Sequence, residues 1–226
     1  MFIGHFAVGF ASKRVAPKTS LGLLVTAPLF LDLQRPLFLL FGWEPVRVDR
    51  GAATFTPYTF DTYPISHSLV TALAWAALFA LVYWARTRYR AGAITLGLGV
   101  MSHWVLDALA HRPDLPLYPG GTAMVGFHLR DSVALAVAIE SLMFVAGVAL
   151  YLSFTRAKDR TGNAALWALV LFLALPFAAK AMSPAPPGPG TILWVSLVGW
   201  LVPLWAWELD RHRVVAEARA APAAGD

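Results

Sequence analysis

Six segments of this chain are apolar over lengths that can cross a lipid bilayer. A transmembrane helix needs roughly 20 predominantly apolar residues. The candidate spans cover residues 20–42, 67–85, 91–111, 133–153, 163–182 and 191–208. The segments predict an all-α, polytopic membrane protein with about six transmembrane helices. Proline residues inside the spans are tolerable where neighbouring helices satisfy the carbonyl groups that they free.

The composition supports lipid as the surrounding solvent. Hydrophobic residues make up 58% of the chain and charged residues only 14%, whereas an ordinary soluble domain is about 25% charged. Nine Trp and fourteen Phe residues are typical of a protein that anchors at two membrane interfaces. The absence of Cys excludes disulfides, thiolate metal sites and cysteine nucleophiles.

The first twelve residues are apolar but too short to span. The basic residues Lys13 and Arg14 follow this apolar run instead of preceding it, which is the wrong order for a signal peptide. We expect a half-length helix packed inside the bundle, within a single integral membrane domain over 1–226. The long loop 43–66 is expected to be irregular, and the Ala-rich tail 214–226 to be frayed.

The basic residues predict the orientation in the membrane. Three of them occupy each of four connecting or terminal segments on one predicted side, which together hold twelve of the eighteen Lys and Arg residues: Lys13, Arg14, Lys18; Arg86, Arg88, Arg90; Arg156, Lys158, Arg160; Arg211, Arg213, Arg219. Cytoplasmic loops carry such an excess. We therefore expect a bacterial inner-membrane protein with a cytoplasmic C-terminus. The net charge of +5 then needs no nucleic-acid partner, and membrane lipid is the expected surrounding partner.

Ionisable residues interrupt the apolar spans at one common level. Insertion scales assign such residues a cost of roughly 2.5–3.5 kcal/mol, so they are expected to be paired, to face a cavity or to be functional. From the helical rise, His103 and Glu140 both lie about 12 Å below the predicted outer surface, and Asp32 about 15 Å. His67 lies at the outer rim, and His5 reaches this level if the first helix doubles back. We expect them to face one pocket in the outer half of the membrane.

The spacing of His103, Asp107 and His111 favours a metal site. Side chains four residues apart share one helical face, so His103 and Asp107 can converge on one ion. Imidazole and carboxylate ligands without thiolate suit zinc, with manganese or iron as alternatives. Such a metal lowers the pKa of a bound water to about 7 and supplies a nucleophile. His111 is then a rim residue, a second-site ligand or a substrate contact.

Further residues take roles around this expected centre. Glu140 is the candidate general base, and Asp107 is a candidate for either the catalytic or the ligand role. Arg35 and Arg112 are candidates for holding an anionic group such as phosphate.

Each of these residues also has a purely structural interpretation. A His103–Asp107 hydrogen bond can join membrane helices. Asp32 and Arg35 can form an ion pair between residues i and i+3 of one helix. Glu140 can pair with Arg130 or with a Ser on another helix, and His67 can lie at the interface beside Ser66, a potential N-cap.

Several short motifs carry a family resemblance. They are Gly4–Gly9 (GHFAVG), Pro28–Asp32 (PLFLD), Ile65–Leu69 (ISHSL), Ser102–Asp107 (SHWVLD) and Leu115–Pro119 (LPLYP). In this order they resemble the bacterial membrane-bound, metal-dependent hydrolase family, which includes LexA-regulated inner-membrane proteins. The resemblance covers roughly residues 1–120. It implies a hydrolase with metal ligands at His5, Asp32, His67, His103 and Asp107.

Two positions depart from that family's pattern. The family often has Asp-x-Asp where this chain has Asp32-Leu33-Gln34, and a further His where this chain has Thr62 beside Asp61. Both changes remove or move candidate ligands, and they favour a mononuclear or a degenerate site over a full dinuclear one.

The leading functional hypothesis is hydrolysis of an ester or phosphoester, lipid-linked or small, at the outer half of the membrane. A proton- or cation-coupled transporter is one alternative, in which Asp32, Glu140 and the His residues relay protons; the lack of an inverted repeat weighs against it. A non-enzymatic membrane protein with a structural polar layer is the other.

Overall fold

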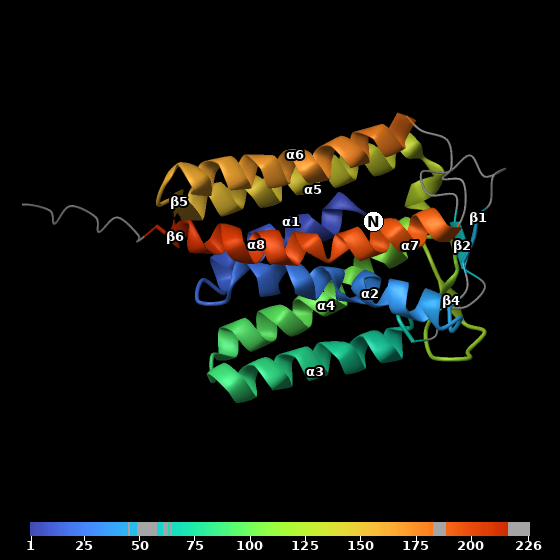
Figure 1. Cartoon of the computed structure of the whole chain (residues 1–226). Coiled ribbons are helices and arrows are strands. Elements are labelled where there is room, and N and C mark those ends of the chain that lie inside the picture. The colour runs from blue at the N-terminus through green and yellow to red at the C-terminus, as the bar shows by residue number, and fades with distance from the viewer. Residues whose placement is uncertain (45, 49–57, 61–62, 64, 183–188, 217–226) are drawn as a thin grey trace, which may run out of the picture.

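The protein is a bundle of helices arranged along one common direction (Figure 1). The computed structural model describes the whole chain except residues 45, 49–57, 61–62, 64, 183–188 and 217–226. Its helices are α1 (Ile3–Val15), α2 (Leu21–Leu40), α3 (Leu69–Thr87), α4 (Arg90–Ala110), α5 (Val133–Phe154), α6 (Arg160–Met182), α7 (Pro189–Gly199) and α8 (Leu201–Arg211). Five of these, α2 to α6, are long and apolar enough to cross a membrane. The predicted all-α, polytopic membrane fold is therefore confirmed.

The sixth predicted span, 191–208, is not one continuous helix. It divides into α7 and α8, which follow one another along the bundle in Figure 1. Pro203 lies just after the break and lacks the N–H that would bond to the carbonyl of Gly199 in a continuous helix. Proline alone does not cause the break, since α2 and α6 continue through their internal prolines. Trp200, between the two helices, donates its indole N–H to the carbonyl of Leu33 at 3.0 Å. Each half has 11 residues and measures about 16 Å, too short to span alone.

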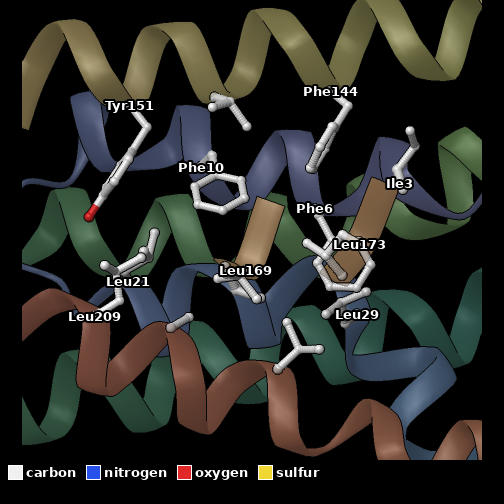
Figure 2. Packing of buried hydrophobic residues seen from close by; sticks show 14 of the residues in the cluster. Ile3, Phe6, Phe10, Leu21, Leu29, Phe144, Tyr151, Leu169, Leu173 and Leu209 are labelled. Atoms are coloured by element: carbon white, nitrogen blue, oxygen red, sulfur yellow. The ribbon is translucent and has the colours of Figure 1, made fainter. Parts of the chain in front are cut away.

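The first helix is the predicted half-length helix inside the bundle. α1 has 13 residues, which correspond to about 20 Å. Figure 2 shows Phe6 and Phe10 of α1 lying between α5 on one side and residues of α2 and α8 on the other. Residues 16–20 then return the chain to α2, whose N-terminus is capped by the hydroxyl of Ser20. The chain thus doubles back at this turn as expected.

Small residues allow α1 to lie close to its neighbours. A Cβ atom added to Gly147 of α5 would meet the carbonyl oxygen of Ala7 at 2.5 Å. A Cβ added to Gly9 would meet the Cα of Val25 in α2 at 2.9 Å. Because both obstacles are backbone atoms, they cannot rotate away. These two glycines set how closely α1 packs between α5 and α2.

We expect Gly147→Ala to destabilise the protein for this reason. Helix propensity alone would favour alanine by about 1 kcal/mol, but overpacking against backbone costs about 1–3 kcal/mol. The net loss should appear as a lower free energy of unfolding in detergent, followed by circular dichroism. Gly190→Ala in α7 is the matched control, because no heavy atom of the described residues lies within 4 Å of its added Cβ. A Gly147→Ala protein that is more stable than the parent would refute the close approach of α1 and α5.

Short strand pairs close both ends of the bundle. At one end, β1 (Val46–Val48) pairs with β2 (Tyr58–Phe60), and β3 (Leu115–Pro116) pairs with β4 (Met124–Val125), both antiparallel. A 3-10 turn, η1 (Leu129–Asp131), leads into α5. The loop 43–66, expected to be irregular, therefore contains a strand pair, since its ends are brought together between α2 and α3.

At the other end, β5 (Thr155–Ala157) pairs with β6 (Arg213–Val215). The start of the tail expected to be frayed is therefore ordered. The guanidinium of Arg213 is buried and donates to Thr155 and to the carbonyl of Gly162. These bonds hold residues 213–215 against the bundle, and residues 217–226 lie outside the described residues.

Candidate metal centre

The C-terminal half of α4 presents one face of ionisable residues. His103, Asp107 and His111, four residues apart, are buried at 0–2% exposure. One turn before His103, a Cβ added to Gly99 would meet the Cβ of Ala27 in α2 at 2.9 Å. α4 therefore lies close against α2, and the polar face of α4 points into the bundle.

All five predicted metal ligands meet at this face. The Nε2 of His103 lies 3.3 Å from the Nε2 of His67, 3.4 Å from Asp107 Oδ2 and 3.9 Å from Asp32 Oδ1. The Nε2 of His67 lies 3.6 Å from Asp32 Oδ1 and 3.8 Å from Asp107 Oδ2. The Nε2 of His5 lies 3.3 Å from Asp107 Oδ1. Two groups of three have ligand atoms mutually within 4.8 Å, and His103 belongs to both.

The backbone fixes His103. Its Nδ1 lies 2.7 Å from the carbonyl oxygen of Pro28, and a carbonyl can only accept, so Nδ1 carries the proton. The neighbouring Trp104 donates its indole N–H to the carbonyl of His67 at 2.9 Å. These two bonds connect α4 to α2 and to the segment before α3. In its neutral form His103 therefore turns the lone pair of Nε2 toward His67 and the two carboxylates.

α1 brings His5 to the cluster. The His5 ring is stacked on that of His103 with centroids 4.0 Å apart and planes 7° apart. The amino group of Met1 pairs with Oδ1 of Asp107. Among the described residues, His5 Nδ1 is one of the buried polar atoms without a hydrogen-bond partner. The predicted return of α1 to this level is confirmed.

Asp32 and Arg35 lie at the edge of the cluster. The guanidinium of Arg35 lies 2.8 Å from Asp32 Oδ1 and donates to the Nε2 of His67 at 3.1 Å. The ion pair expected between i and i+3 is thus present, and it forms within reach of the other ligands. The Asp32 side chain is 35% exposed, whereas those of His5, His67, His103 and Asp107 are exposed by 3% or less. Asp32 is therefore the most exposed of the five.

His111 links the cluster to the adjoining loop. Its Nε2 lies 3.5 Å from Asp107 Oδ2 and has no hydrogen-bond partner within the part of the chain that the structure describes. Its Nδ1 lies 2.9 Å from Oδ1 of Asp114 and 3.4 Å from the Tyr63 hydroxyl. Burial alone would raise the pKa of Asp114, but the hydrogen bond and charge of His111 outweigh it and lower that pKa.

Arg112 points to a different partner. Its guanidinium Nε donates to Oδ1 of Asp131 at 2.9 Å, and its side chain is 52% exposed. This hydrogen bond lowers the pKa of Asp131. Of the two arginines predicted to hold substrate, Arg35 contacts the cluster, while Arg112 is paired with Asp131 on the loop surface.

Glu140 contacts the start of α1. Its Oε2 accepts from the backbone N–H of Phe2 at 2.6 Å and of Gly4 at 3.3 Å. The partner of Glu140 is thus the backbone of α1 rather than Arg130 or a Ser side chain. The carboxylate is 3% exposed and lies where a helix has unpaired N–H groups and a positive dipole end.

The donor set fits a divalent cation. The Nε2 atoms of His67 and His103 lie 3.3 Å apart, and the guanidinium of Arg35 lies 3.1 Å from the same Nε2 of His67. Tetrahedral ligands at zinc bond lengths are themselves about 3.3 Å apart. Two carboxylates complete a set of hard and borderline ligands. The residues present therefore fit zinc, manganese or iron without a thiolate.

Sequence reasoning did not identify the groups that hold the ligands in place. Ser68 caps α3 by accepting from the Thr71 N–H, while Ser66, the predicted cap, bonds to Glu44 and His67. Glu44 is 2% exposed in the loop after α2. One signal pointed to it: an acidic residue directly after an apolar span, in a loop otherwise free of acids until Asp49.

Comparison with known proteins gives the family. The model of the YdjM inner membrane protein family matches residues 63–185, more than half of the chain. The chain belongs to this family. The matched region includes His67, His103, Asp107 and Glu140, while His5 and Asp32 precede it. No curated protein and no solved structure gives a significant match. The predicted inner-membrane location is thus supported by the family, whose description names no reaction.

Proposed function

We propose that this YdjM-family protein is a metal-dependent hydrolase that acts on an ester or phosphoester at the membrane. The observation that carries the proposal is the pair of imidazole Nε2 atoms 3.3 Å apart, between two buried or half-buried carboxylates. Each imidazole belongs to a different segment and has its Nδ1 engaged by another group. A charged cluster in lipid is costly. Arg35 pairs with Asp32 and the amino group of Met1 pairs with Asp107, and a bound cation would take over part of this charge compensation.

The ion would be held by residues of the two candidate groups that share His103: His5, Asp32, His67, His103 and Asp107. Zinc bound there would lower the pKa of a water ligand to about 7. Arg35, already directed at Asp32 and His67, would neutralise an anionic group on the substrate. Its planar guanidinium presents several N–H donors, which suits a phosphoryl or carboxyl oxygen.

We place the cluster in the outer half of the bilayer. The basic segments gather at the other end of the bundle, where β5 and β6 lie. The excess of Lys and Arg assigns that end, and the C-terminus with it, to the cytoplasm. The substrate would therefore be lipid-linked or would approach from outside the cell.

Metal binding provides the first test. Purified protein, stripped with chelator and titrated with zinc or manganese, should bind about one equivalent. A metal that binds only the folded state stabilises it by about 2.7 kcal/mol when its free concentration is 100 times Kd. We therefore expect the thermal unfolding midpoint to rise with added metal and to fall again with chelator. Unchanged unfolding would favour the structural polar layer over the enzyme.

Hydrolysis provides the second test. The loaded protein in detergent micelles is assayed with a p-nitrophenyl phosphate ester and a p-nitrophenyl acyl ester that carry matched alkyl chains. Metal-dependent release of nitrophenol from either would support the proposal and name the bond class. A proteoliposome flux assay is the counter-test, because coupled ion flux without hydrolysis would favour the transporter.

A further inference from the structure

A buried carboxylate outside the proposed ligand set lies behind His67. Glu44 Oε1 accepts from the backbone N–H groups of Ile65 and Ser66, at 2.8 and 2.9 Å. Its Oε2 accepts from the hydroxyl of Ser66 at 2.5 Å. Ser66 and His67 are both 0% exposed. The carboxylate thus holds the loop before α3 by both oxygen atoms.

These contacts determine the direction of the next hydrogen bond. A serine hydroxyl has one proton. In Ser66 this proton lies in the hydrogen bond that the hydroxyl donates to the carboxylate of Glu44. The same oxygen lies 2.6 Å from the Nδ1 of His67, so the Ser66 oxygen must accept and His67 Nδ1 must donate. Nε2 of His67 is then left with a lone pair, in agreement with the N–H of Arg35 that points at it.

We propose that Glu44 and Ser66 form a positioning relay that selects the tautomer of His67 and so makes Nε2 of His67 a metal ligand. The inference rests on the proposed function for the identity of the ligand, and on the four hydrogen bonds for the relay itself. Groups that orient a metal-binding imidazole through its second nitrogen are worth about 10- to 100-fold in metal affinity. Glu44 touches neither ion nor substrate in this scheme.

Glu44→Gln reverses the relay with little change in shape. The amide oxygen can still accept from the two backbone N–H groups. Its NH₂ group then replaces Oε2 and donates to the Ser66 oxygen, which directs the Ser66 proton toward Nδ1 of His67. This bond favours the proton of the neutral imidazole at Nε2, against the opposing N–H of Arg35, and a proton at Nε2 obstructs a cation.

The experiment reads the tautomer directly. Full-length protein labelled with ¹⁵N-histidine is studied by NMR in micelles, with the His67 signals assigned by their loss in His67→Gln. We expect the Nδ1–H tautomer in the metal-free parent and a shift toward Nε2–H in Glu44→Gln. Zinc affinity should fall about 10- to 100-fold in the same variant. Glu208→Gln, an exposed position on α8, is the matched control and should change neither quantity.

Ser66→Ala provides the second variant. It removes the hydroxyl but leaves the backbone bonds of Glu44, so it tests the relay even if Glu44→Gln fails to fold. We expect it to mix the two tautomers and to weaken zinc binding. An Nδ1–H tautomer that persists in both variants, or an Nε2–H tautomer in the parent, would overturn the relay. Failure of the parent to bind zinc would instead overturn the proposed function, because the tautomer is measured without metal.

Discussion

Replacing His103 with alanine is expected to lower the affinity for zinc by at least ~100-fold. His103 belongs to both groups of candidate ligands, and its Nε2 lies within 3.9 Å of His67, Asp107 and Asp32. Loss of a ligand should exceed the 10- to 100-fold that outer groups contribute. Titration of stripped protein with zinc, followed by calorimetry or by elemental analysis after dialysis, measures the change.

The variant is compared with His128→Ala. His128 is also bonded to an aspartate, Asp131, at 3.1 Å, but its side chain is 52% exposed on the loop before α5. Its loss should leave zinc affinity unchanged. If both variants bind zinc as well as the parent, the cluster around His103 is not a metal site. Metal-dependent hydrolysis should disappear with binding in His103→Ala and persist in His128→Ala.

The pairing of His103 with Asp107 on α4 was predictable because it depends on local geometry alone. The i, i+4 spacing places His103 and Asp107 on one face in any helix. Charged groups inside an apolar span can also be singled out from the sequence, because placing them in lipid costs free energy. The level of Asp32 and His67 followed from counting residues along each span. These arguments need only the helical rise, and the structure brings the predicted residues together.

The groups around the ligands could not be predicted in the same way. Glu44 lies in a loop, where no helical period fixes its direction, and its partners Ile65 and Ser66 are more than 20 residues away. The break between α7 and α8 could not be predicted from Pro203, because α2 and α6 stay continuous through their own prolines. Arg112 pairs with Asp131, which belongs to the turn η1, and does not pair with the cluster. Such contacts depend on tertiary packing, which sequence spacing does not encode.

The buried carboxylate of Glu140 has two possible roles. Sequence reasoning made it a general base, whereas its contacts hold the backbone at the start of α1. α1 carries His5 within its first turn, so the position of His5 depends on this attachment. A carboxylate at a helix N-terminus also interacts favourably with the helix dipole.

We therefore expect Glu140→Ala to lower the free energy of unfolding by about 2–3 kcal/mol, because two N–H groups lose their acceptor. Zinc affinity should fall about 10-fold, because the start of α1 would no longer be held in place and it carries His5, which contacts Asp107. Glu140→Gln keeps one acceptor oxygen and should lose about 1 kcal/mol. Chemical denaturation in detergent and zinc titration measure both effects, with the exposed Glu208→Ala as control.

A general base would produce a different pattern. Removing one typically lowers turnover by 10²–10⁴-fold through lost proton transfer, and it need not disturb folding or metal binding. If Glu140→Gln retains the stability and zinc affinity of the parent but loses hydrolysis, the positioning role is refuted and the base is supported. Loss of stability and affinity in Glu140→Ala, with turnover retained in Glu140→Gln at saturating zinc, would assign Glu140 to holding α1. The comparison works because the amide preserves the hydrogen bond from the backbone while removing the carboxylate's ability to take a proton.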